Sequence, residues 1–348
     1  MRRLPIFFVL DCSESMAGEN LQRMEEGIGM IVRSLRQDPH ALETVYLSTI
    51  AFAGVARTIA PLVELITFYP PKLPIGSGTS LGLALQELMR QMDSVVIKTT
   101  AEQKGDWKPV IYLFTDGKPT DKVETAIATW RKDYSHRATL VAIAMGRYAD
   151  VSALQRLTDT VLLFDDQKDG DFKQFIAWVT ASVSSQSKSV GEAQGNDFVL
   201  PRSDNKVVTL LKKGELAPPP PSDMDCVVLV GRCQKSRNPY LIKYDRLKKI
   251  LPLNPEMPSS RFELTGCYPV TDEYFQWSAG DAANLLVSTS DLLGAPGCPY
   301  CGNISAFGMC GCGKLLCLNG PGEATCPWCN TGIIFEFGGG FDVQRGRG

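Results

Sequence analysis

The sequence predicts an α/β protein with two domains. The first is a doubly wound, mostly parallel sheet, and the second is a smaller β-rich domain that ends in a zinc-ribbon-like or RING-like cysteine cluster. Three observations predict this fold. Over about the first 190 residues, apolar runs alternate with amphipathic segments, which is typical of helices packed on both faces of a parallel sheet. A polar stretch with four consecutive prolines follows, and seven cysteines then lie in close pairs between residues 298 and 329.

Short apolar runs give the expected strands of the first domain, and apolar residues three and four apart give its helices. The strands are expected at 4–10, 45–53, 109–114, 138–145 and 160–164. The helices are expected at 21–35, 81–95, 122–134, 151–158 and 171–184. The run 56–65 follows its neighbour with too few residues between for a helical crossover, so we expect an antiparallel edge strand there.

Composition shifts give the expected domain boundaries. We expect a sheet domain at 1–190, a proline-rich linker at 191–222, a zinc-binding domain at 223–340 and a disordered tail at 341–348. The serine-rich stretch 182–189 is a candidate kinase target because we expect it to be exposed.

The charge is nearly balanced, with 36 Lys+Arg against 38 Asp+Glu and a net charge of -2. This balance gives no sign of a surface for polyanions. The opening resembles a signal peptide, but its apolar run stops at Asp11 and no cleavage site follows. No run approaches the ~18 apolar residues that a membrane span requires. We therefore expect a soluble, cytoplasmic protein that does not bind membranes.

Oxygen-bearing side chains follow the ends of the expected strands. Asp11 ends the first strand and is followed by Ser13 and Ser15, and Asp116 follows the strand at 109–114. Thr79 lies in a glycine-rich loop that leads into a helix. Ligands of open parallel sheets bind outside the carboxyl ends of the strands, so these five side chains form a candidate metal site. Helix capping and turn formation are the alternative roles for the same residues.

A set of oxygen donors with little negative charge suits a hard cation such as Mg²⁺, with Mn²⁺ or Ca²⁺ as alternatives. An ion held mainly by neutral hydroxyls stays electrophilic. We therefore expect it to take one more oxygen from an acidic or phosphorylated partner.

The motif D-x-S-x-S at residues 11–15, the loop Thr79 and the Asp116 of T-D-G resemble the metal-ion-dependent adhesion site of von Willebrand factor A (VWA) domains. The order and spacing of these motifs along residues 1 to about 190 match as well. The resemblance implies that the two serines and the threonine contact the metal and that the aspartates complete or support its shell.

The cysteines indicate zinc rather than disulfides, because the total of eleven in the whole chain is odd and no secretory signal is present. Two C-x2-C knuckles can share one tetrahedral site, but the cysteines between them leave other pairings open, so one or two Zn²⁺ ions are expected. For a second site, Cys267 is the nearest spare cysteine that could act as an eighth ligand. We expect a structural role, since a four-cysteine shell has no open position. The candidate ligands are Cys298, Cys301, Cys310, Cys312, Cys317, Cys326 and Cys329.

A VWA-like domain followed by this cysteine module resembles the tellurite-resistance proteins of the TerY type. The segments "RNPYLIKYDR", "YPVTDEYFQWS" and "CGCGKLLC" also look like parts of that family's metal-binding domain. The resemblance implies a cytoplasmic bacterial protein that works beside a serine/threonine kinase and a PP2C-type phosphatase in stress or defence. That family's C-terminal domain is described with seven cysteines and one histidine, whereas no histidine follows His136 here.

The favoured function is a non-enzymatic adaptor that binds a partner through its metal. A phosphohydrolase with Asp11 as nucleophile is a weaker alternative, because Ser13 breaks the D-x-D pattern of aspartyl phosphatases. Nucleic-acid binding by the zinc module is another alternative, but residues 298–329 carry only Lys314 and no arginine for phosphate contacts. The loop "GSGTSLG" lacks the lysine of a phosphate-binding P-loop.

Overall fold

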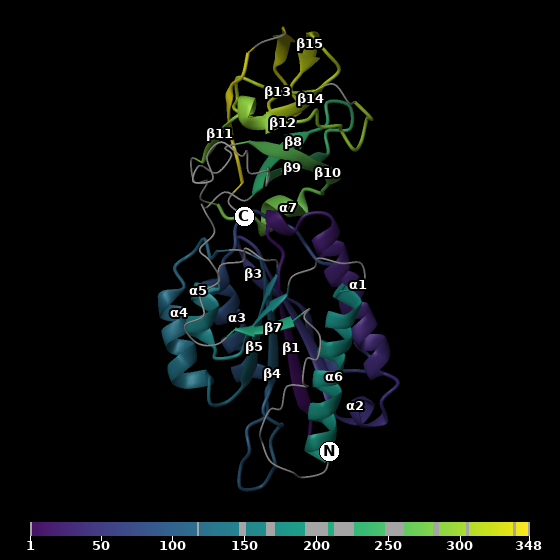
Figure 1. Cartoon of the computed structure of the whole chain (residues 1–348), viewed down its shortest axis with the longest axis vertical. Helices are drawn as coiled ribbons and strands as arrows, with labels where there is room; N and C mark the ends of the chain where they lie inside the picture. Colours follow the sequence, from purple (N-terminus) through teal and green to yellow (C-terminus); the bar gives the residue numbers. More distant parts are fainter. Residues whose placement is uncertain are drawn as a thin grey trace, which may run out of the picture. The chain divides into compact units, whose positions relative to one another are not determined.

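A computed structural model describes residues 2–116, 118–145, 151–164, 171–191, 208–211, 226–247, 261–280, 285–303, 306–336 and 339–346 (Figure 1). The chain forms two compact units. The first comprises Met1–Cys12, Glu19–Leu73 and Thr79–Pro219. The second comprises Ser13–Gly18, Pro74–Gly78 and Pro220–Gly348. The expected tetraproline spacer lies outside the described residues.

The first unit contains a seven-stranded sheet in the order β3-β2-β1-β4-β5-β6-β7. The β1–β2, β1–β4, β4–β5 and β5–β6 pairs are parallel, and both edge strands are antiparallel. The mostly parallel sheet and the antiparallel edge strand β3 are therefore confirmed. The strands are β1 (Leu4–Asp11), β2 (Val45–Phe52), β3 (Ala56–Glu64), β4 (Val110–Thr115), β5 (Thr139–Met145), β6 (Val161–Phe164) and β7 (Val208–Leu211).

Helices cover both faces of this sheet (Figure 1). On β1, Phe7 and Val9 face a core shared with α3 and α4, whereas Phe8 and Leu10 line a small apolar cavity with residues of α1 and α6. Alternate strand residues point to opposite faces, so a strand buried on both sides is a continuous apolar run. The helices are α1 (Glu19–Leu35), α2 (Pro39–Thr44), α3 (Leu81–Val95), α4 (Glu124–Thr129) with a π-helical turn (Trp130–Tyr134), α5 (Ser152–Leu157) and α6 (Asp171–Gly191).

Three differences from the sequence-based expectations concern the predicted linker and its flanks. Strand β7 lies within the expected linker and extends the sheet beside β6. Helix α6 continues past residue 184, because Ser182 and Ser187 are buried and bonded to Tyr112 and Thr44. The expectation that the serine-rich stretch is exposed is therefore wrong for these two serines.

The second unit is built around a six-stranded sheet in the order β12-β10-β9-β8-β14-β13. Two further two-stranded sheets, β11-β17 and β15-β16, complete it. The tail was expected to be disordered. Part of it instead forms β17, which pairs with β11 and buries Val343 in the core. The elements are η1 (Glu14–Met16), β8 (Cys226–Arg232), β9 (Pro239–Arg246), β10 (Phe262–Pro269), α7 (Glu273–Trp277), β11 (Leu286–Ser288), η3 (Thr289–Asp291), β12 (Leu292–Leu293), β13 (Ala306–Met309), β14 (Leu315–Leu318), β15 (Gly322–Thr325), β16 (Gly332–Phe335) and β17 (Asp342–Gln344).

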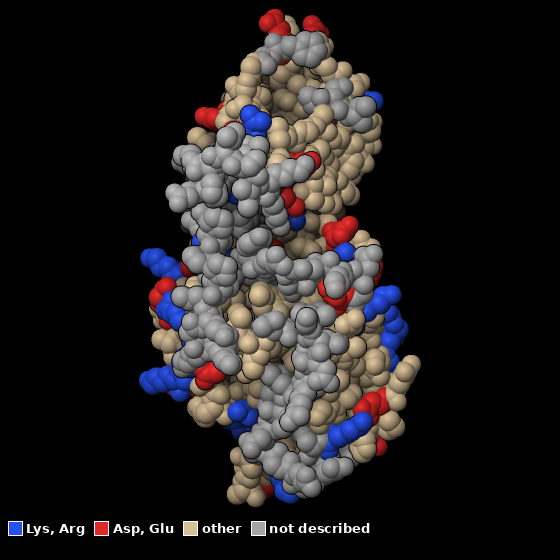
Figure 2. All heavy atoms as spheres, viewed as in Figure 1, with Lys and Arg blue, Asp and Glu red and all other residues tan. Residues whose placement is uncertain are grey.

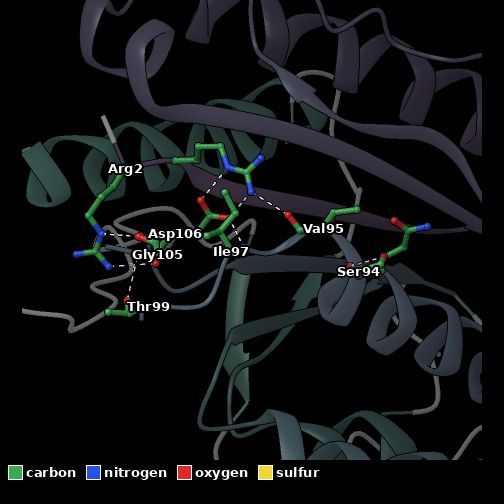
Figure 3. A network of polar contacts seen from close by, with 9 residues as sticks. Arg2, Ser94, Val95, Ile97, Thr99, Gly105 and Asp106 are labelled. Atoms are coloured by element: carbon green, nitrogen blue, oxygen red, sulfur yellow. Dashed lines mark hydrogen bonds and ion pairs between the residues drawn. The ribbon is translucent and has the colours of Figure 1, made fainter. Parts of the chain in front are cut away.

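A polar network fixes the start of β1 against the loop that precedes β4 (Figure 3). Arg3 donates two hydrogen bonds to the Asp106 carboxylate, at 2.8 and 2.6 Å, and one to the Val95 carbonyl. The Ile97 N–H donates to the same carboxylate at 2.8 Å. The Asp106 side chain is only 2% exposed, so it depends on these donors.

In the described part of the chain, no helix has the length and apolar character needed to cross a membrane.

Candidate metal centres

Asp11 ends β1 and is fully buried at the carboxyl edge of the sheet. Its Oδ2 accepts a hydrogen bond of 2.6 Å from the hydroxyl of Thr115, the last residue of β4. The two strands are parallel neighbours, with Leu10 opposite Phe114, so both end at the same edge. Asp116 follows directly. A buried carboxylate is costly unless donors or a cation compensate it, and the Thr115 hydroxyl is one such donor.

Thr79 is connected to the same edge by backbone hydrogen bonds. Its N–H donates to the Thr120 hydroxyl at 2.8 Å, and the Thr120 N–H donates to the Thr79 carbonyl at 2.9 Å. The next N–H, of Ser80, donates to the Ala53 carbonyl just beyond β2. The loop that carries Thr79 is therefore tied to the end of β2 and to the loop after β4.

The remaining two hydroxyls follow Asp11 along the chain. The Oγ atoms of Ser13 and Ser15 lie 3.0 Å apart, and both residues come within four positions of Asp11. Asp121 instead accepts from the N–H groups of Gly82 and Leu83 and so caps the first turn of α3. Joint binding of one ion by Asp11, Ser13, Ser15, Thr79 and Asp116 stays a prediction.

A first group of four sulfurs lies inside the second unit, and we name it the core cluster. Its sulfurs all lie within 4.8 Å of one another. Three of its cysteines belong to the main apolar core of this unit, and Cys301 packs against that core. The cluster joins the turn after β8, the turn at 298–301 and strand β14. Its members are Cys233, Cys298, Cys301 and Cys317.

A second group, the surface cluster, contains Cys310, Cys312, Cys326 and Cys329, again within 4.8 Å. The first two lie in the turn between β13 and β14, and the other two lie in the turn between β15 and β16. Cys312 and Cys329 are exposed. The cluster therefore joins two hairpin turns.

These groups revise the expected ligand arrangement. The two C-x2-C knuckles do not share a site, since Cys298 belongs to the core cluster and Cys326 to the surface cluster. The eighth sulfur comes from Cys233, so the suggestion of Cys267 is wrong. Cys233 was missed because 65 positions separate it from Cys298 (298 − 233), and only the pairing of β8 with β14 brings its turn to the cluster.

The backbone around each cluster favours the thiolate forms that metals require. In the core cluster, the N–H groups of Gln234 and Ser236 donate to the sulfurs of Cys317 and Cys233. In the surface cluster, the N–H groups of Cys312 and Trp328 donate to the sulfurs of Cys310 and Cys326. Such N–H donors stabilise negative sulfur. Four cysteine sulfurs within 4.8 Å of one another can hold a metal ion, and sets of four cysteines are typical of closed, structural zinc sites.

The pKa shifts of the cysteines go in both directions, and burial raises the pKa of the cluster residue Cys317 as it does that of Cys267. Hydrogen bonding by Thr331 lowers the pKa of Cys329 to about 6. Burial, with a smaller contribution from neighbouring Cys298, raises the pKa of Cys267 to about 11. What separates Cys267 from the core cluster is geometry, since it is not one of the four cysteines whose sulfurs lie within 4.8 Å of one another.

Trp328 lies between the two knuckle ligands Cys326 and Cys329. The Arg232 guanidinium carbon lies 4.5 Å from its ring centroid and 5.5 Å from that of Phe275. The two rings meet edge to face at 5.8 Å, and the indole N–H donates to the Leu315 carbonyl at 2.7 Å. The surface cluster thus positions an indole ring that packs on two other elements of this unit.

Comparison with known proteins identifies the first half. Residues 6–177 match the von Willebrand factor type A domain, and this range holds strands β1 to β6 together with Asp11, Thr79 and Asp116. The chain therefore contains a VWA domain. Residues 223–348 match the TerY-C metal binding domain, and this range holds all eight clustered cysteines. The chain thus combines the two domains of a TerY-type protein.

The chain also has more distant likenesses. Matrilin-3 of Gallus gallus is 24% identical over 159 residues, which cover 44% of this chain and 34% of the matrilin. The chain therefore spans about a third of the length of this relative. Among solved structures, proximal thread matrix protein 1 from the mussel byssus is 15% identical, with a TM-score of 0.39, over 53% of this chain and 48% of that chain. The PilB minor pilin from Streptococcus sanguinis is 12% identical, with a TM-score of 0.40, over 56% and 63%.

Proposed function

We propose that this protein is a non-enzymatic adaptor that captures an acidic or phosphorylated partner through a divalent cation at the carboxyl edge of the VWA sheet. The ion is Mg²⁺, with Mn²⁺ or Ca²⁺ as alternatives, and its ligands are Asp11, Ser13, Ser15, Thr79 and Asp116. The observation that carries the proposal is the buried Asp11 carboxylate at an edge where the loops of three neighbouring strands are joined by hydrogen bonds.

The donor set fits such an ion. Carboxylate and hydroxyl oxygens are the ligands that hard cations prefer, and Mg²⁺ often keeps coordination positions for water or a partner oxygen. Bound there, the ion supplies electrostatic attraction for an anionic group. Asp11 and Asp116 supply the negative charge, and the hydroxyl side chains orient the shell.

Two further features support a binding role over catalysis or nucleic-acid binding. The TerY-C clusters offer four sulfurs each, which closes the shell of a zinc ion and leaves no position for substrate. On the face shown in Figure 2, basic and acidic side chains are interspersed over the first unit. A nucleic-acid surface instead gathers lysine and arginine.

The resemblance to TerY-type proteins extends the proposal to its partners. We propose a serine/threonine kinase and a PP2C-type phosphatase as partners, in the cytoplasm, within a tellurite-resistance, stress or defence response. Phosphorylation of one of these partners would create the anionic group that the ion binds.

The test is affinity capture by the full-length protein with Mg²⁺ and with a chelator, compared between wild type and Asp11→Asn. The variant keeps the side-chain shape and removes the charge, so we expect capture and Mn²⁺ binding to fall at least about tenfold. Thr79→Val is a second variant, and Glu102→Gln, an exposed carboxylate in the loop before β4, is the matched control. If Asp11→Asn and Thr79→Val still capture the partner as well as wild type does, and still only with metal present, the proposal is contradicted.

A further inference from the structure

The two sulfur clusters differ in access to solvent, although their internal geometry is alike. In the core cluster the sulfurs of Cys301 and Cys317 lie 3.7 Å apart, and in the surface cluster those of Cys310 and Cys329 lie 3.6 Å apart. In the core cluster, Cys233, Cys298 and Cys317 are at most 4% exposed. The surface cluster instead presents Cys312 and Cys329 to solvent.

The clusters also differ in what they hold together. The core cluster joins the β8–β9 turn to β14, in the middle of the six-stranded sheet, and shares its apolar core with residues such as Leu229 and Ile242. The surface cluster joins one end of the β13–β14 hairpin to the separate two-stranded sheet β15-β16. We therefore expect loss of the core metal to destabilise the middle of the six-stranded sheet. Loss of the surface metal should only detach the β13–β14 hairpin from the β15-β16 sheet.

We propose that the surface cluster is an oxidant-sensitive metal site, which a peroxide converts to a disulfide with release of its metal ion, while the core cluster keeps its own. Of the two exposed sulfurs, Cys329 is the one expected to react, because it lies 3.6 Å from its partner Cys310, whereas Cys312 lies 3.9 Å from Cys326. Access to thiolate sulfur decides which cysteines an oxidant modifies, and access is the property in which the clusters differ.

The reaction balances as a two-electron oxidation. The Cys329 thiolate attacks one oxygen of hydrogen peroxide, the O–O bond breaks and hydroxide leaves, which gives a sulfenic acid. The Cys310 thiolate then attacks the Cys329 sulfur, the S–S bond forms and a second hydroxide leaves. Two protons from solvent convert the two hydroxides to water. The metal ion is left with two sulfur ligands and dissociates, and a thiol reductant restores the pair.

The fluorescence of Trp328 should report oxidation of the surface cluster. Trp328 lies between Cys326 and Cys329 and packs on Arg232 and Phe275. When the surface cluster loses its metal, this knuckle loses its fixed conformation, and the indole leaves the guanidinium and the Leu315 carbonyl. We therefore expect its fluorescence to change together with metal release, and Trp328→Phe to abolish that change.

The test uses the full-length protein loaded with Zn²⁺ and treated with hydrogen peroxide. Released Zn²⁺ is followed with a chromogenic chelator, the retained metal is counted by native mass spectrometry, and disulfides are mapped in peptides. We expect one of two ions to leave at least about ten times faster than the other, with a disulfide between Cys310 and Cys329. The core cysteines should stay reduced in that phase.

A matched pair of variants separates oxidation from simple loss of a ligand. Cys329→His keeps a zinc ligand that peroxide does not oxidise to a disulfide, so the surface ion should be retained in peroxide. Cys301→His makes the same exchange in the core cluster and should leave the fast phase unchanged. Simultaneous release of both ions, earlier release from the core cluster, or equally fast release by Cys329→His would overturn the proposal. So would a first disulfide that excludes Cys329.

Discussion

The two units of this chain are stabilised by different means. The first has a large apolar core on both faces of its sheet, together with the partly buried Arg3–Asp106 ion pair. The second has smaller apolar clusters, and the two that surround the sulfur groups contain the ligand cysteines themselves. Small cores rarely supply enough free energy without a metal or a disulfide. In the second unit the clustered cysteines are part of the core, so we expect metal to contribute to its folding, whereas the first unit should fold without it.

Removing metal from the whole protein should give the largest difference between the units. A structural zinc site contributes roughly 10–16 kcal/mol of apparent binding free energy, which is as large as the total stability of a typical domain. A strong chelator with a reductant should therefore unfold the second unit and leave the first folded. Amide hydrogen exchange measured by mass spectrometry should show protection lost in β8 and β9 but kept in β1 and β4. Equal loss or equal retention in both units would break the comparison.

Removing one ligand should distinguish the two clusters within the second unit. Cys233→Ser leaves the core cluster with three sulfurs in the middle of the sheet, so we expect loss of this ion and unfolding of β8, β9 and β14. Cys329→Ser should lose one ion while the six-stranded sheet stays protected. The checks are zinc stoichiometry and hydrogen exchange of the same peptides. If Cys329→Ser also unfolds the sheet, the two clusters are equivalent in stability.

Replacing Asp106 should affect the first unit alone. The side chain accepts hydrogen bonds from Arg3 and from the Ile97 N–H while almost fully buried. Asp106→Asn should lower the free energy of unfolding by about 3 kcal/mol, measured by denaturant unfolding of the first unit at constant zinc content. Asp159→Asn is the control, because Asp159 pairs with Arg131 at 3.6 Å with its side chain 71% exposed and should cost at most about 0.5 kcal/mol. Similar losses for both variants would contradict this difference.

The sheet of the first unit could be predicted because burial on both faces gives its central strands long apolar runs. Strand β1 is buried at every position, so its sequence stops being apolar only where the strand ends, at Asp11. The short elements β7 and α2 carry no such signal. Strand β7 is four residues long, and its place is set by pairing with β6 rather than by its own composition.

The candidate sites show the same contrast between features that local sequence predicts and features that depend on distant contacts. Asp11 and Asp116 could be predicted from local sequence, because each follows an apolar strand and parallel neighbours end at one edge. The knuckle cysteines could be predicted from their spacing. The division of the sulfurs between two clusters, and the part played by Cys233, depend on contacts between strands far apart in sequence. Ligand spacing alone does not contain this information.

Lowering the pH should have the smallest of these effects on stability. In the first unit, acid acts by protonating carboxylates. Hydrogen bonding by Arg90, with Thr58 and Gln91, outweighs partial burial and lowers the pKa of Glu87 from 4.5 to about 2. This group therefore stabilises the folded unit fully above pH 4.5, and the contribution is lost as the pH falls toward 2. Between pH 5 and pH 3, the melting temperature of the first unit should fall less in Glu87→Gln than in wild type. The melt is followed by exchange in α3 and β3 peptides, since acid also releases metal from the second unit. An equal fall in both proteins would show that Glu87 has the same pKa folded and unfolded.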